Sequence, residues 1–109
     1  MPFKQKYHWG PYLWCFIHTI TISDGNNNLE YNTHVKKILQ SLVHIIPCPT
    51  CVQTYKEHLI ILNEKDLSRP MTLFYWSVDL HNLVNTKLNK TPLSYDKALA
   101  IWTVGSLAV

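Results

Sequence analysis

Two of the three cysteines in this chain of 109 residues stand three positions apart, in the stretch Pro47-Cys48-Pro49-Thr50-Cys51. A helix that begins here would carry both cysteine side chains on one face, roughly 5–6 Å apart, which suits the geometry of a disulfide. The N-terminus of a helix also favours negative charge, so it stabilises a thiolate and makes the pair easy to oxidise. Redox chemistry is therefore the first prediction for Cys48 and Cys51.

Two other functions are compatible with the same pair. A structural zinc ion needs four ligands, and a helical interaction module could offer Cys48, Cys51, His44 and His58, although this order matches no standard zinc-finger spacing. Alternatively, the pair could relay disulfides to another protein as a dithiol carrier that holds no flavin. Cys15 stands alone in an aromatic stretch, and we expect it to be a small buried apolar residue.

The composition is that of a globular protein, because 47% of the residues are apolar and only 16% are charged. We expect one domain over 1–109, with its core at about 7–104 and short tails. The net charge of +3 is spread along the chain, which argues against a nucleic-acid partner. No stretch has the apolar run of a signal peptide or the ~20 apolar residues of a membrane span, so we expect an intracellular protein. Structural disulfides are rare there, which favours redox or metal chemistry for the close pair.

Apolar residues recur at helical spacing along most of the chain, and no convincing alternating strand is visible. A thioredoxin-like domain, which needs strands, does not fit this pattern. Pro11 is expected in the first turn of the first helix, and Ser94 is expected to cap the last one. The pattern predicts five helices, at about 7–22, 29–46, 49–62, 70–88 and 95–104. Helices of this length with short connections predict an all-α fold, an antiparallel four-helix bundle with a short fifth helix.

Polar side chains on two of these helices are candidates for binding a ligand. On the first helix, a spacing of four residues places on one face Gly10, Trp14 and His18. On the fourth, three residues share a face with Asn82 beside them: His81, Asn85 and Leu88. Amides and imidazoles on an otherwise apolar helix are costly to bury unless they are paired, and a polar ligand would pair them. Lys87 and Lys90 at the helix end could meet phosphates. Each stretch alone is also compatible with a packed helix or an exposed asparagine-rich face.

Taken together, the three stretches resemble the FAD-linked sulfhydryl oxidases of the Erv/ALR family. The motifs follow one another as in that family: WGxxxWxxxH at 9–18, CPxC at 48–51 and HNxVNxxLxK at 81–90, with Trp102 in the last short helix. The resemblance covers about 7–104, and the lean chain looks like the viral branch of the family.

The resemblance implies a four-helix bundle with a short fifth helix and with FAD held at one end. It implies that Cys51 lies against the flavin and that Cys48 exchanges disulfides with protein dithiol substrates. Electrons would pass from Cys51 to FAD and then to O2, which becomes hydrogen peroxide. No metal ion is implied. The cofactor-binding residues that it implies are Gly10, Tyr12, Trp14, His18, His81, Asn82, Val84, Asn85, Lys87, Leu88, Lys90 and Trp102. Within this set, Lys87 and Lys90 would lie near the diphosphate, Trp102 would lie near the adenine, and Gly10 would permit close approach.

The chain departs from the family in its other cysteines. It has no second shuttle pair, so we expect either a separate redox partner with a CxxC pair or direct action on the substrate. Many members tie the fifth helix with a disulfide near positions 77 and 95, which here hold Ser77 and Tyr95. We therefore expect packing alone to hold that helix, with bound FAD adding stability. The resemblance also implies a homodimer through the first two helices, and a role in forming virion disulfides at assembly sites in the host cytoplasm.

Overall fold

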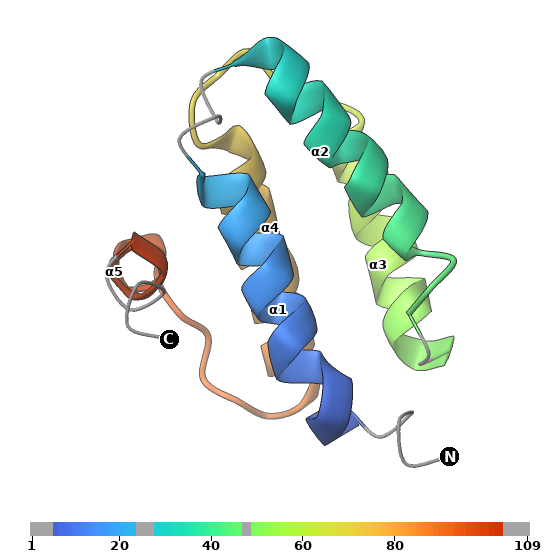
Figure 1. Cartoon of the computed structure of the whole chain (residues 1–109). Coiled ribbons are helices and arrows are strands. Elements are labelled where there is room, and N and C mark those ends of the chain that lie inside the picture. The colour runs from blue at the N-terminus through green and yellow to red at the C-terminus, as the bar shows by residue number, and fades with distance from the viewer. Residues whose placement is uncertain (1–5, 24–27, 47–48, 104–109) are drawn as a thin grey trace.

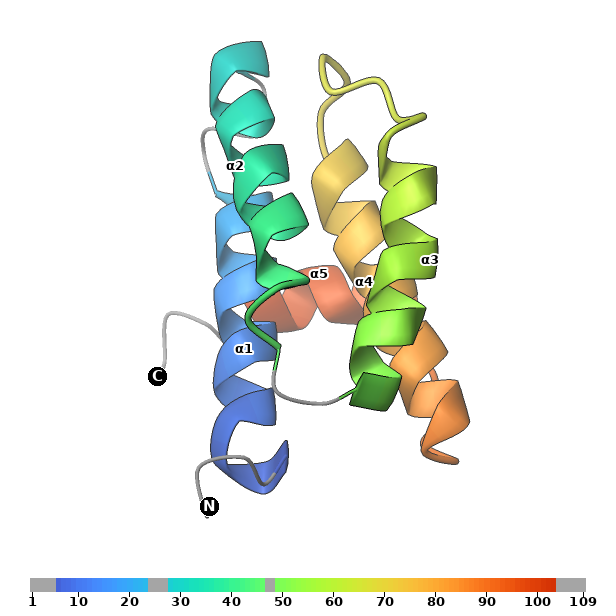
Figure 2. The same cartoon turned by 90° about the vertical axis from the view of Figure 1, so that its right-hand side faces the viewer.

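The computed structural model describes residues 6–23, 28–46 and 49–103, and every regular element in these ranges is a helix. The helices are α1 (Lys6–Ile22), α2 (Leu29–Leu42), α3 (Pro49–Leu62), α4 (Thr72–Lys87) and α5 (Tyr95–Thr103). Consecutive helices from α1 to α4 run in opposite directions, and α5 lies across α1 and α4 (Figure 1 and Figure 2). The predicted all-α bundle with a short fifth helix is confirmed. None of the described helices has the length and apolar character that crossing a membrane requires.

α1 and α2 differ from the sequence prediction at one point each. Pro11 is the sixth residue of α1 rather than a first-turn residue, because the helix begins at Lys6, and its missing N–H removes one backbone bond. α2 ends at Leu42 rather than at position 46. The N–H groups of His44 and Ile45 bond carbonyls three residues back, at 3.1 and 3.0 Å, so the backbone there forms turns instead of helix.

Left-handed backbone conformations limit α4 at both ends. The helix begins at Thr72 rather than at position 70, because Met71 has a φ of 67°, which a right-handed helix does not accommodate. After the helix ends, Asn89 has a φ of 59°, and the N–H of Lys90 bonds the carbonyl of Asn85 at 2.7 Å. This closure is a Schellman motif, because the N–H of Asn89 also bonds the carbonyl of Thr86, and asparagine tolerates the left-handed conformation better than most residues.

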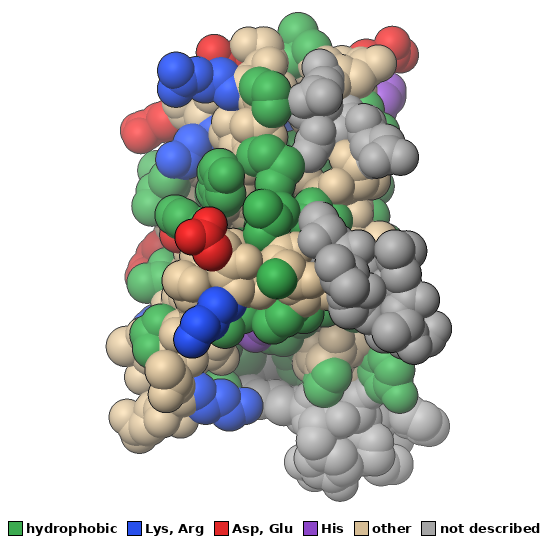
Figure 3. Space-filling model, turned by 90° about the vertical axis from the view of Figure 1, so that its left-hand side faces the viewer, with side chains coloured by type: hydrophobic (Ala, Val, Ile, Leu, Met, Phe, Trp, Pro, Cys, Tyr) green, Lys and Arg blue, Asp and Glu red, His purple; other side chains and the backbone are tan. Residues whose placement is uncertain are grey.

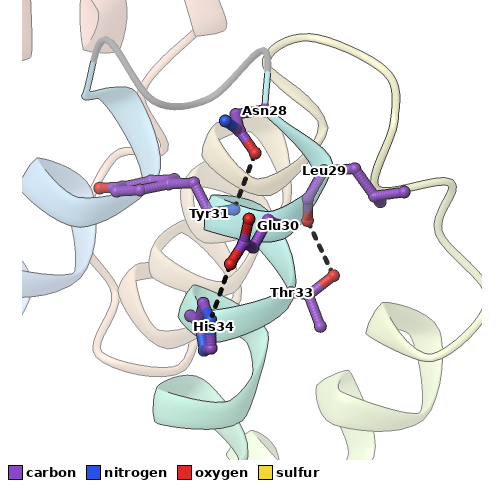
Figure 4. Close-up of polar contacts among 6 residues, drawn as sticks. All are labelled: Asn28, Leu29, Glu30, Tyr31, Thr33 and His34. Carbon is purple, nitrogen blue, oxygen red and sulfur yellow. Dashed lines mark hydrogen bonds and ion pairs between the residues drawn. The ribbon is translucent and has the colours of Figure 1, made fainter.

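Side-chain bonds define the start of α2 (Figure 4). Asn28, at the N-cap, accepts a hydrogen bond from the backbone N–H of Tyr31 at 3.2 Å and so satisfies a donor that the helix leaves free. The hydroxyl of Tyr31 donates to the carbonyl of Ile20 at 2.9 Å, which ties this first turn to α1. Glu30 and His34 lie 4.0 Å apart on the exposed side, where an ion pair contributes little stability.

The core lies where α1 packs against α4, with α2 and α3 closing it. Its fully buried apolar side chains include Ile17, Leu39, Leu62, Leu73, Trp76 and Leu80. Beyond Leu80 the apolar residues of α4 leave the core, since Val84 and Leu88 line a cavity and Leu83 is 44% exposed.

α5 begins as predicted, at a capped residue. The Oγ atom of Ser94 accepts a hydrogen bond from the N–H of Lys97 at 3.2 Å, and its carbonyl accepts from the N–H of Ala98 at 2.9 Å. The predicted last residue of this helix, Val104, lies outside the described residues. A helix this short is not stable alone, so its position depends on contacts with the bundle.

α5 is held on the bundle by hydrogen bonds as well as by packing. Its Ala98 is buried against α4. In the connection before it, Asn82 of α4 donates to the carbonyl of Leu93 at 2.7 Å and accepts from the N–H of Leu93 at 2.8 Å. The hydroxyl of Tyr95 donates to the carboxylate of Asp79 at 2.5 Å. The expectation that packing alone holds this helix is therefore wrong, because polar side chains of α4 bond its first residue and its connection.

Substitution of Asn82 tests this attachment. We expect Asn82→Ala to lower the free energy of unfolding by about 2 kcal/mol, because Leu93 loses the partner of both its N–H and its carbonyl. Asn82→Asp keeps the acceptor for the N–H and should lose about half as much. Urea denaturation measures the loss, and hydrogen exchange of the α5 amides shows whether it is local. Wild-type stability and protection in Asn82→Ala would show that this residue does not hold α5.

Candidate active site

The antiparallel order of the helices brings four chain segments to one end of the bundle. The first half of α1, the end of α2, the start of α3 and the second half of α4 meet at the lower end in Figure 1. A cavity of about 720 Å³ lies there, within the usual range for cofactor sites. Figure 3 shows a hollow in the lower half of one face, with a histidine deep inside it and basic side chains at its edge.

Most of the predicted site residues line this cavity: Gly10, Trp14, Cys51, His81, Val84, Asn85, Leu88, Lys90 and Trp102. They come from α1, α3, α4 and α5 and from the connection after α4. A Cβ atom added at Gly10 would meet no heavy atom within 4 Å, so no described contact requires glycine at that position. The close approach of a ligand at Gly10 stays a prediction.

Four of the predicted residues do not line the cavity. Tyr12 is 76% exposed and lies on the outer side of α1. Asn82 is engaged with the connection before α5, as described above. Lys87 donates to the hydroxyl of Thr54 and so bridges α4 to α3 instead of pointing along the cavity wall. His18 is fully buried and lies behind the wall, where its ring supports the residues in front of it.

An aromatic stack forms one side of the cavity. The rings of Trp14 and His81 lie 3.9 Å apart between centroids and are almost parallel, with an interplanar angle of 9°. The His18 ring lies edge to edge with His81, with 5.1 Å between the centroids, and Trp102 of α5 lies 4.8 Å from His18. Three helices thus contribute aromatic rings to one wall of the cavity, and such a wall suits a planar ligand.

A chain of hydrogen bonds lies behind this surface. The Nδ1 atom of His18 lies 3.0 Å from the Oγ atom of Ser77, and its Nε2 atom lies 2.9 Å from Nδ1 of His81. Burial lowers the pKa of His18 to about 3, and the neighbouring His81 adds to this. Burial also lowers the pKa of His81 to about 4, and the charge of Lys90 adds to that shift. Both rings are therefore neutral at pH 7.

The cysteines differ in state and in position. Cys51 lies in the first turn of α3, lines the cavity and takes part in a disulfide. Its predicted redox partner, Cys48, lies outside the described residues. Cys15 is a free thiol on α1 and is only half-buried, so the expectation of a buried residue is wrong. It stands next to Phe16, which is 44% exposed on the outer side of that helix.

The histidines of the zinc alternative lie apart from one another. His44 is exposed after the end of α2. His58 is buried on α3, where its Nε2–H group donates to the carbonyl of Trp76 at 3.0 Å. Burial lowers the pKa of His58, which favours its neutral form. Within the described ranges, no group of three His, Cys, Asp or Glu side chains could hold a metal ion.

Sequence reasoning missed several residues of the wall: Trp9, Pro11, Leu13, Ile17, Ile46, Tyr55 and Leu80. Helical spacing could have found some of them. Leu13 and Ile17 lie three and seven residues after Gly10, and Tyr55 lies four residues after Cys51, so each pair shares a helix face. Ser77 contacts the site only through His18, and no spacing rule indicates such a role.

Comparisons with known proteins identify the family. The model of the Erv1/Alr family matches residues 11–103. A protein of Acanthamoeba polyphaga mimivirus, named "Probable FAD-linked sulfhydryl oxidase", is 31% identical over 94 residues, which cover 84% of this chain and 66% of that protein. The FAD-linked sulfhydryl oxidase of an African swine fever virus isolate is 30% identical over 92 residues, which cover 83% of this chain and 76% of that protein. No solved structure matches the chain significantly.

This chain belongs to the Erv1/Alr family, because the family model covers most of its length. The class of protein that the fold and the relatives define is the FAD-linked sulfhydryl oxidase, an enzyme that forms disulfides and uses FAD as its cofactor. The chain spans about two thirds of the length of the mimivirus protein and about three quarters of the African swine fever virus protein.

The residues of the cavity fit FAD. The parallel rings of Trp14 and His81 suit a planar ring system, and the apolar lining suits its burial. Lys90 brings positive charge to the same wall, where a diphosphate would need it. Cys51 belongs to that wall as well, so a dithiol pair and a flavin could meet there.

The buried histidines predict a loss of stability in mild acid. The pKa of His18 in the folded chain, about 3, lies below the ordinary value of 6.5, so the unfolded chain binds a proton that the folded chain does not. The stability that neutral His18 contributes to the folded chain is therefore fully present above pH 6.5 and is lost as the pH falls toward 3. Between pH 7 and pH 5 we expect the free energy of unfolding to fall by about 2 kcal/mol from His18 alone.

Urea denaturation at the two pH values measures this change, and two variants locate its source. His18→Asn should be less stable at both pH values but should lose the part of the pH dependence that comes from His18. His34→Asn, on the exposed side of α2, should keep the full pH dependence. Equal stability of the wild-type protein at pH 5 and pH 7 would contradict the account of the buried rings.

Proposed function

We propose that this chain forms disulfides in protein substrates through the redox pair Cys48 and Cys51, with FAD bound in the cavity at the end of the bundle. The observation that carries the proposal is the position of Cys51. It is a disulfide-bonded residue in the first turn of α3, and it lines the same cavity as the aromatic stack of Trp14 and His81. Membership of the Erv1/Alr family supports the same reading.

The dithiol exchange proceeds in two displacements. A substrate thiolate attacks the sulfur of Cys48, which forms a mixed disulfide and releases Cys51 as a thiolate. The second thiolate of the substrate then attacks the substrate sulfur of the mixed disulfide and displaces Cys48 as a thiolate. The substrate leaves with a new disulfide, and Cys48 is left reduced. The N-terminus of α3 stabilises the thiolate of Cys51. When bound, FAD supplies the acceptor for the two electrons of the reduced pair and their transfer to O2, which takes up two protons and becomes hydrogen peroxide.

We propose the cofactor-binding roles from the resemblance to the family together with the lining of the cavity. Trp14 and His81 would lie against the ring system, Lys90 against the diphosphate and Trp102 near the adenine. Four further residues would complete the wall: Gly10, Val84, Asn85 and Leu88. Three others would support it from outside the cavity: His18, Asn82 and Lys87. Tyr12 is exposed on the outer side of α1, and we leave it out of the proposal.

We further propose that a separate protein with a CxxC pair carries disulfides from this chain to their final substrates. The sequence has three cysteines, so beyond Cys48 and Cys51 it supplies no second dithiol. The relatives named above are viral proteins, which supports virion proteins as the final substrates and assembly sites in the host cytoplasm as the location.

Oxygen uptake tests the central step of the proposal. With FAD and dithiothreitol, the wild-type protein should consume O2 and form an equal amount of hydrogen peroxide. Cys51→Ser should slow this turnover by about 100-fold or more, because the exchange and the electron transfer both need its sulfur. Cys15→Ser is the matched control, since Cys15 is a free thiol outside the cavity wall, and its rate should stay near that of the wild type.

The same experiment separates the alternatives. Thiol–disulfide exchange without oxygen uptake would identify a dithiol carrier and refute the oxidase. An active Cys51→Ser would remove Cys51 from the mechanism.

A homodimer through α1 and α2 is the last part of the proposal. Tyr12 and Phe16, four residues apart on α1, are 76% and 44% exposed. Ile38 of α2 is 41% exposed, and α1 and α2 pack side by side. Large apolar side chains that are exposed on neighbouring helices are typical of a surface that a partner covers.

Sedimentation of charged variants tests the dimer. The wild-type protein should sediment with twice the chain mass of 12.7 kDa, and a Tyr12→Glu, Phe16→Glu double variant should sediment as a monomer. Ile60→Glu places the same charge on α3, where Ile60 is 65% exposed, and should leave the dimer intact. A monomeric wild type at micromolar concentration is the result that refutes this part.

A further inference from the structure

Ser77 of α4 is fully buried, and its contacts fix the direction of the hydrogen-bond chain behind the cavity wall. Its hydroxyl donates to the carbonyl of Phe74 at 2.6 Å. A carbonyl only accepts, so the single hydroxyl proton of Ser77 is used in that bond. The contact between Ser77 and Nδ1 of His18, at 3.0 Å, therefore requires Nδ1 to carry a proton and to donate it.

A second hydroxyl in the same place does not change this assignment. The Oγ1 atom of Thr21 lies 3.3 Å from the Oγ atom of Ser77, but it donates its own proton to the carbonyl of Ile17 at 2.9 Å. The hydroxyl of Thr21 also reaches the carbonyl of His18 but neither of its ring nitrogens, so within the described residues Ser77 decides which nitrogen of that ring is protonated.

The proton on Nδ1 of His18 determines the state of His81. A neutral imidazole carries one ring proton, so Nε2 of His18 is an acceptor. Nδ1 of His81 lies 2.9 Å from that atom and must be the donor. Nε2 of His81 is then unprotonated, and no residue in the described ranges hydrogen-bonds to it. Because His81 lines the cavity, this nitrogen is an acceptor that a ligand can use.

We propose that Ser77 is a positioning residue, which acts through His18 to hold His81 in the Nδ1–H tautomer and so presents an unprotonated Nε2 atom to the cofactor. The cofactor group that binds this nitrogen must then carry an N–H or an O–H. In FAD these groups are the ring imide, the ribityl and ribose hydroxyls and the adenine amine, whereas phosphate and carbonyl oxygens are rejected. The inference rests on the proposed function only in naming FAD as the ligand.

Removal of the Ser77 hydroxyl reverses the direction of the hydrogen bonds from Ser77 through His18 to His81. Free neutral histidine prefers the proton on Nε2, so these hydrogen bonds hold both rings in their less common tautomer. Without the Ser77 oxygen, a proton on Nδ1 of His18 would be buried without an acceptor, which is costly. The proton would move to Nε2, which would donate to Nδ1 of His81, and His81 would then present a donor to the cavity instead of an acceptor.

Histidine NMR reads these tautomers directly. Long-range 1H–15N spectra of the full chain, labelled at histidine and recorded before and after addition of FAD, distinguish a protonated ring nitrogen from an unprotonated one. In the wild type we expect His18 and His81 to be protonated at Nδ1. In Ser77→Ala we expect both rings to change to the Nε2–H tautomer and the FAD dissociation constant to rise about tenfold.

Thr21→Val is the matched control, because it removes a hydroxyl from the same buried place without touching a ring nitrogen. It should leave both tautomers as in the wild type, whatever it does to stability. A wild-type His81 protonated at Nε2 would overturn the proposal even if Ser77→Ala does not fold. Unchanged tautomers in a folded Ser77→Ala would overturn it as well. The expected tautomers in a protein that binds no FAD would refute the cofactor and leave the role of Ser77 standing.

Discussion

The packing of α1 against α4 is the contact on which the rest of the structure depends. One interface holds the apolar core, with Ile17 and Leu80, and the buried polar chain of Ser77, His18 and His81. Apolar burial stabilises the pair but would tolerate sliding, whereas a buried imidazole with both nitrogens bonded does not. A shift of one residue along α4 would leave His18 unpaired, so the polar chain sets the register and the apolar contacts supply the stability.

That register decides what the cavity can do. It places His81 against Trp14 at one end of the bundle, and the antiparallel order brings the first turn of α3 to the same end. Cys51 therefore lies in the first turn of a helix and also lines the aromatic-walled cavity, so that its sulfur and a planar ligand would share one site. α5 closes the arrangement, since Trp102 lies against His18 and Asn82 fixes the connection that precedes the helix.

Much of this arrangement could be predicted from the sequence, because it follows local rules. Helical periodicity predicted the five helices, and motif spacing predicted residues that come together in the wall, such as Trp14 and His81. The rest depends on tertiary contacts. The start of α4 depends on the left-handed backbone of Met71, for which the sequence carries no glycine signal. The hydrogen bond from Lys87 to Thr54 could not be predicted from sequence spacing, because the two residues lie on different helices. Ser77 was noted only because it stands where many family members have a cysteine, and its role rests on the direction of hydrogen bonds, which no pattern of residue types records.

The visible absorption spectrum of the purified protein tests the central claim most directly. The claim is that the cavity at the end of the bundle holds FAD within reach of Cys51. The account predicts a yellow protein with the two-banded spectrum of oxidised flavin, about one FAD per chain, and loss of that colour when dithiothreitol is added without air. A colourless protein that cannot be reconstituted with FAD would contradict the claim.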